Sequence, residues 1–138
     1  MLTGTMNPDP GSREAADSLV QAARSASDGS LRAELANAMV AMKKQFYGRG
    51  PEAAKAWILD DYVFVAMEGG LTRNEETLLA DGKEDLIRQY RLSFQSTMSG
   101  ATMGAVSQLT GRKVLTYHSQ IVFNPARTFE IFVLEPEA

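Results

Sequence analysis

Four consecutive residues have the chemistry of an anion-binding turn: Gly48, Arg49, Gly50 and Pro51. A guanidinium held on a stiff turn offers N–H donors in a fixed fork that matches a carboxylate or another anion. Arg49 can instead pair with an internal carboxylate such as Glu52, Asp60 or Asp61, as charged turn residues commonly do. The sequence leaves both interpretations open.

The glycines of this turn also suit the end of a helix. An apolar helical pattern runs to Tyr47, and Gly48 then stands where helices commonly end in a left-handed residue. A Gly-Arg pair recurs at Gly111 and Arg112, again after a helical pattern. A phosphate-binding loop needs a strand before its glycines and a helix after them, which is the reverse of the order here. We therefore predict helix ends at Gly48 and Gly111 and no phosphate cradle.

The single histidine, His118, is the side chain whose ordinary pKa lies nearest neutrality. Together with Arg49 and Arg112 it could form a pH-responsive anion pocket at the ends of two hairpins. The alternative is a surface or hydrogen-bonded strand histidine, because strand alternation puts His118 on the polar face with Thr116 and Gln120.

Catalytic equipment is sparse. With one histidine and no cysteine, a metal site would need carboxylates for nearly all its ligands, and the sequence has no Gly-x-Ser-x-Gly motif. The adjacent Asp60 and Asp61 could shift each other's pKa and supply a general base, but aspartates between two apolar runs more often form a turn. We expect no catalytic residue, no metal and no cofactor.

The composition is that of an ordinary globular protein, with 138 residues, 44% hydrophobic residues and a net charge of -3. No apolar run approaches the ~20 residues of a membrane span, and the negative charge disfavours broad nucleic-acid binding. The absence of a signal-like apolar segment and of cysteine predicts a cytoplasmic protein that does not insert into membranes.

Apolar periodicity predicts a two-layer α+β domain over residues 30–138, in the order α-β-β-α-α-β-β. Two hairpins, around Asp60-Asp61 and around the run NPAR, should form an antiparallel sheet packed against two longer helices. A capping box at Thr72 and Glu75 begins the shorter helix between them. Residues 1–29 should form a tail, a weak helix from Ser12 to Ala26, and a break at the run SDGS.

The long helix after Lys83 has apolar residues on two sides. One predicted inward series steps by three or four: Ile87, Tyr90, Phe94, Met98, Ala101, Ala105 and Leu109. Others should point elsewhere: Leu86, Leu92, Met103 and Val106. A helix with two apolar faces is usually covered on both, so we expect a homo-oligomer, most simply a dimer.

In the first strand of the second hairpin, the apolar face should carry Leu115, Tyr117, Ile121 and Phe123.

The run GRGPEAAKAWILDDYVFVAMEGGLT and the later LTGRKV resemble the MpsC-like family, once a bacterial domain of unknown function and later named for a proposed Na+-translocating membrane-potential-generating system. The resemblance covers roughly Leu31 to Glu135. It implies a small cytosolic protein without established catalysis, acting beside membrane proteins that handle cations or bicarbonate. Family members often carry an aspartate just after the position of His118, where this chain has Ser119 and Gln120.

These observations leave two functions to compare. The first is a non-enzymatic interaction module, a homo-oligomer that contacts a membrane-protein partner through the Arg49 turn. The second is a sensor of a small anion bound by Arg49 and His118.

Overall fold

The structure, a computed structural model, describes the backbone of residues 12–137 and the side chains of residues 29–137. Its contacts divide the chain into two compact units, Met1–Ser30 and Leu31–Ala138. The predicted N-terminal tail lies outside the described residues, apart from Ser12. The second unit contains the whole sheet and every candidate site residue.

The first helix, α1, spans Ser12–Tyr47 without interruption, so the predicted break at the run SDGS is wrong. A single interior glycine costs a helix only about 1 kcal/mol relative to alanine, and this run lacks proline. The helix does end at Gly48, which has φ 81° and whose N–H donates to the carbonyl of Lys44 at 2.9 Å.

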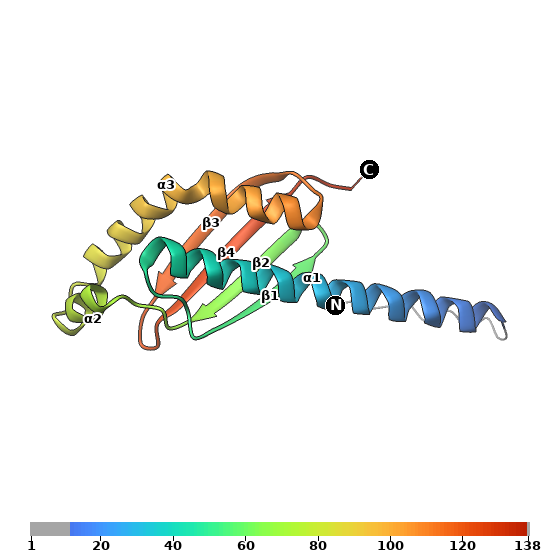
Figure 1. Ribbon diagram of the computed structural model, residues 1–138, viewed down its shortest axis with the longest axis horizontal. Coiled ribbons are helices and arrows are strands. Elements are labelled where there is room, and N and C mark those ends of the chain that lie inside the picture. Colours follow the sequence, from blue (N-terminus) through green and yellow to red (C-terminus); the bar gives the residue numbers. More distant parts are fainter. Residues whose placement is uncertain (1–11, 138) are drawn as a thin grey trace. The chain divides into compact units, whose positions relative to one another are not determined.

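Four antiparallel strands form one sheet in the order β1-β2-β4-β3 (Figure 1). The strands are β1 (Ala53–Leu59), β2 (Tyr62–Glu68), β3 (Val114–Val122) and β4 (Arg127–Leu134). The two predicted hairpins are present, and β2 joins β4 along seven residue pairs in the middle of the sheet. The predicted α+β class and element order are confirmed.

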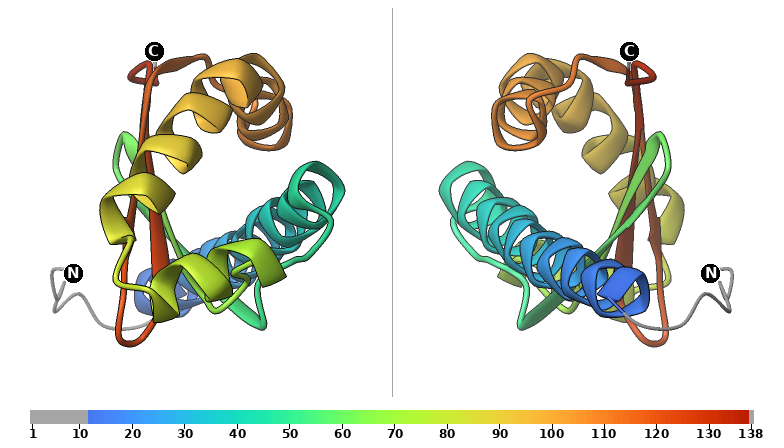
Figure 2. Two further views of the ribbon diagram at one scale, coloured as in Figure 1. Left: turned by 90° about the vertical axis from the view of Figure 1, so that its left-hand side faces the viewer. Right: turned by 90° about the vertical axis from the view of Figure 1, so that its right-hand side faces the viewer.

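Within the unit Leu31–Ala138, the helices cover a single face of the sheet (Figure 2). They are the C-terminal part of α1, the short α2 (Arg73–Ala80) and the long α3 (Glu84–Thr110). Val63, Val65 and Phe132 on the covered face are fully buried, and Leu35 and Met39 of α1 pack against them. We call the opposite, uncovered side of the sheet the outer face.

The inward side of α3 matches the predicted one only in part: Ile87 is buried and Leu109 packs against the core. Of the five buried residues of this helix, Ile87 and Val106 are apolar, and the other three are polar: Arg91, Gln95 and Thr102. Tyr90 and Ala101, which we expected inside, are exposed, whereas Val106 is in the core. The prediction failed because apolar periodicity cannot find a helix face that is buried against polar partners.

In β3 the predicted alternation is broken at Leu115. The register shifts between Val114 and Thr116, which pair with the consecutive residues Leu134 and Val133 of β4. Leu115 is the extra residue of a bulge and is 47% exposed, while Val114 is buried in its place. From Tyr117 to Ile121 the odd-numbered residues face the helices as predicted.

Candidate functional site

Arg49 is exposed and paired. Its Nη1 donates to Glu76 Oε1 of α2 at 3.1 Å, and both side chains are about half exposed. The partner is therefore a residue that the sequence did not suggest, not Glu52, Asp60 or Asp61. An exposed pair of this kind contributes at most about 1 kcal/mol, so Arg49 can exchange it for another anion at little cost.

The rest of the Gly-Arg-Gly-Pro turn is packed against its surroundings. A Cβ on Gly50 would lie 3.2 Å from Lys44 Cβ and 3.3 Å from the carbonyl of Val40. Gly70, with φ 85°, faces Pro51 so closely that a Cβ there would lie 3.1 Å from the proline backbone. Close packing thus explains the glycine at position 50 and the glycine at position 70, which lies opposite Pro51.

Arg112 acts as a clamp at the opposite end of the first hairpin. Its guanidinium donates to the carbonyl of Asp60 at 2.9 Å, to Asp61 Oδ1 at 2.5 Å and to the carbonyl of Glu135 at 2.8 Å. Asp60 takes the left-handed φ of 53° in this turn. Gly111, also left-handed, ends α3 just before the clamp. Arg112 therefore ties the β1–β2 turn to the end of β4.

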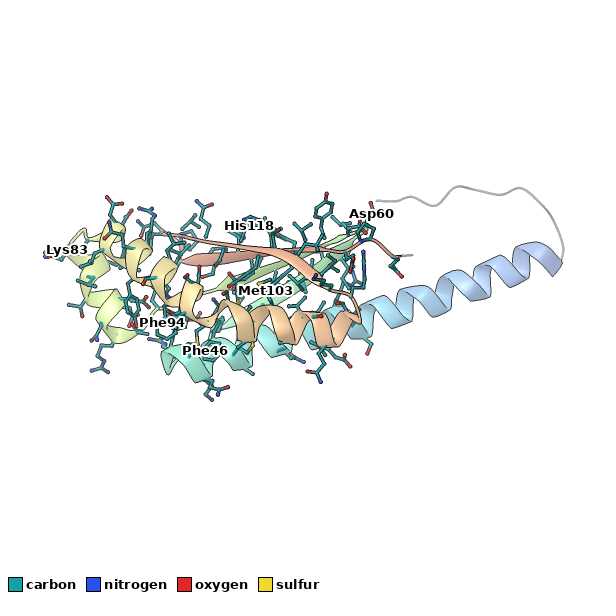
Figure 3. The ribbon with its side chains drawn as sticks, turned by 90° about the horizontal axis from the view of Figure 1, so that it is seen from above. Phe46, Asp60, Lys83, Phe94, Met103 and His118 are labelled. Atoms are coloured by element: carbon teal, nitrogen blue, oxygen red, sulfur yellow. The ribbon has the colours of Figure 1, made fainter. Side chains whose placement is uncertain are left out.

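His118 is exposed on the outer face, where its Nε2 lies 3.2 Å from Thr116 Oγ1 (Figure 3). The three residues of the predicted anion pocket are not brought together. Arg49 lies before the start of β1 and Arg112 beyond its end, and seven extended residues span roughly 23 Å. A site made of Arg49, Arg112 and His118 is therefore not assembled.

A buried ion pair beneath α2 was not predicted. Arg91 of α3 donates to Glu75 through Nε at 2.6 Å and Nη2 at 2.5 Å, and to the carbonyl of Gly70 at 3.2 Å. Its guanidinium also lies 4.1 Å from the ring centroid of Tyr47. Burial raises the pKa of Glu75, but the hydrogen bonds from Arg91 and Thr72 outweigh it, so the pKa is lowered. Burial lowers the pKa of Arg91, but the hydrogen bonds and the charge of Glu75 outweigh burial, so the pKa is raised.

A second buried pair joins α1 to the sheet. Lys43 Nζ lies 3.1 Å from Glu130 Oε1, and the Tyr117 hydroxyl donates to the same oxygen at 2.7 Å. Glu130 is fully buried, and burial followed by the charge of Glu130 raises the pKa of Tyr117. Glu130 lies on the same strand face as the buried Phe132. The alternation of inward and outward residues along β4 was the sequence signal that could have identified Glu130 as buried.

Among the described residues, three buried side-chain oxygens have no hydrogen-bond partner: Tyr47 Oη, Ser119 Oγ and Glu130 Oε2. Tyr47 and Glu130 line a cavity of about 10 Å³, with Lys43, Gln95 and Tyr117 also at its wall. Such a volume holds about one water molecule. This buried polar cluster can therefore order a water and fix the helices, but it cannot admit a substrate.

The outer face carries apolar side chains that the helices do not cover. Trp57, Phe64 and Phe129 form a row of rings with centroid distances of 5.5 and 5.9 Å. Strand register adds four aliphatic or aromatic neighbours to the same face: Leu59, Tyr62, Ile131 and Val133. The β3 edge of this face is polar.

In the part of the chain that the structure describes, no three histidine, cysteine or carboxylate side chains come close enough to hold a metal ion. No helix in the same part is long and apolar enough to span a bilayer.

Comparison with known proteins gives a family match and a relative. The family model described as "Na+-translocating membrane potential-generating system (MpsC)" matches residues 27–136. A protein of Bacillus subtilis (strain 168) with the name "Uncharacterized protein YbcI" is 26% identical over 110 residues, covering 78% of this chain and 88% of that protein. No solved structure matches the chain.

Proposed function

Because the chain belongs to the MpsC family, as its motifs predicted, we propose that it is a non-enzymatic accessory protein that works by binding other protein surfaces. The observation that carries this proposal is the outer face, where seven large apolar side chains are left uncovered by the described residues of the unit. Apolar patches of this extent on a folded unit generally mark interaction sites. The buried polar cluster does not offer a substrate site, since its cavity of about 10 Å³ is too small for a substrate.

The family description supports a proposal about the partner system. That description names a Na+-translocating membrane potential-generating system. We therefore propose a cytoplasmic location, beside a membrane complex that handles cations or bicarbonate. The anion-sensor alternative has less support, because Arg49, Arg112 and His118 lie apart and Arg112 is committed to the β1–β2 turn.

The test is affinity capture from native-host membranes with three variants. Phe64→Glu places a charge in the centre of the outer face, Leu92→Glu changes an exposed residue of α3, and Arg49→Ala removes the Glu76 pair. We expect the wild type to capture an integral membrane protein that transports cations or bicarbonate. At least one of the three variants should fold normally and no longer capture this protein. Failure of the wild type to recover any such protein would contradict the accessory role.

A further inference from the structure

We propose that the outer face is the site at which a second copy of this chain docks, sheet against sheet. This inference deepens the proposed function, on which it rests, by naming the partner of one surface. The membrane partner would then contact surfaces outside this interface.

The chemistry of the outer face is apolar in its middle and nearly neutral overall. Glu68 and Arg127 neutralise each other at one end, with Arg127 Nη1 2.6 Å from Glu68 Oε1. Lys55 keeps its ammonium over the ring of Trp57, 5.4 Å from the centroid. Binding to nucleic acid or to anionic lipid depends on several clustered cations. The face therefore fits another apolar protein surface better than a polyanion.

The width of the outer face favours a second sheet over a single helix as the surface that docks on it. Four strands spaced by about 4.8 Å, each seven to nine residues long, give a surface of at least roughly 19 by 24 Å. A single helix is about 10 Å wide and would leave half of this width in water. A second sheet of the same dimensions covers it entirely, because sheets pack face to face about 10 Å apart.

The face is large enough for an interface at the lower end of the usual size range. Its flat projection is roughly 450 Å², and side chains that stand out from the sheet make the accessible area larger. Standard protein interfaces bury about 800 Å² on each partner. Several of the side chains concerned are well exposed, including Leu59 at 58% and Tyr62 at 52%. Large aromatic residues are typical binding hot spots, and here Phe64 lies on the central strand β2 with Trp57 beside it on the edge strand β1.

Self-docking through the outer face differs from the dimer predicted through α3. The residues expected to form that second helix face include Val106, which is buried in the core. Leu92 remains strongly exposed at 65% and supplies a matched control for the alternative interface. A charge at Phe64 should break a sheet-to-sheet dimer, and the same charge at Leu92 should not.

The experiment uses the purified full chain, with sedimentation and tryptophan fluorescence over about 0.1–100 µM. Trp57 is the sole tryptophan, so its emission reports the outer face directly. We expect a wild-type dimer whose emission moves to longer wavelength on dilution. Phe64→Glu and Ile131→Lys should each raise the dissociation constant at least about 30-fold, while Leu92→Glu leaves it unchanged.

Circular dichroism of every variant controls for folding, and Ile131→Lys provides a second test if Phe64→Glu is unfolded. A wild type that sediments as a monomer throughout the range would overturn the inference. So would a dimer that is broken by Leu92→Glu and kept by Phe64→Glu. Because these measurements use purified protein alone, they are independent of whether a membrane partner is captured.

Discussion

Neutralising Glu75 is expected to destabilise the protein far more than neutralising its neighbour Glu76. Both glutamates lie on α2 and both pair with an arginine, but the Glu75–Arg91 pair is only 3–5% exposed, whereas the Arg49–Glu76 pair is about half exposed. Glu75→Gln can keep the capping box, which accepts either residue, and it removes the charge that compensates Arg91.

The structure sets the magnitude of this effect. Breaking one partner of a buried ion pair typically costs about 3–5 kcal/mol, a large part of the roughly 5–15 kcal/mol that stabilises a domain. The expected fall in the melting temperature is roughly 10–20 °C for a unit of this size. Glu76→Gln should cost about 0–1 kcal/mol, because solvent screens its pair with Arg49.

Urea denaturation followed by circular dichroism measures both variants, and the midpoint and slope together give the change in the free energy of unfolding. Equal losses for Glu75→Gln and Glu76→Gln would refute the argument from burial. A useful companion is the double variant Glu75→Leu/Arg91→Met, which should lose less than the sum of its single changes because no unpaired charge remains buried.

Three further predictions concern pH and backbone strain. The folded state lowers the pKa of Glu75 below its usual 4.5, so its contribution to stability is complete above about that pH and is lost as pH falls; in acid titrations of unfolding, Glu75→Gln should show the shallower loss. Burial raises the pKa of Tyr47 from 10 to about 12, so the unfolded state ionises first and stability falls between these values; Tyr47→Phe should reduce this alkaline loss, as measured by urea midpoints. Gly48→Ala should cost about 1–2 kcal/mol for its left-handed φ alone, and Gly70→Ala should cost more because its Cβ also meets Pro51; equal melting temperatures would contradict this difference.

The sequence was most informative where one residue decides local structure. Gly48 and Gly111 stand at helix ends because a left-handed residue without a side chain is needed there. The Thr72–Glu75 capping box is formed, with the Thr72 N–H donating to Glu75 at 2.9 Å. Such features depend on a few residues that are neighbours in the sequence, so they can be predicted from the sequence directly.

Features that depend on distant partners were not predictable in the same way. The inward Arg91 looks like a surface residue until α2 brings Glu75 beside it. The bulge at Leu115 depends on how β3 pairs with β4. The assignment of Arg49 to Glu76 likewise needed the position of α2, because the two residues lie 27 positions apart in sequence.

The order of the strands has a consequence for how the chain is made. The central position beside β2 is filled by β4, the last of the four strands to leave the ribosome, and the clamp of Arg112 also needs the carbonyl of Glu135. Until then the first hairpin has an unpaired edge at β2 as well as at β1, which remains an edge strand of the complete sheet, and its inner surface is largely apolar. The ribosome thus makes β4, which joins the two hairpins in the middle of the sheet, after the other three strands. A chain that ends before β4 would expose the edge of β2, which could pair with a strand of another molecule.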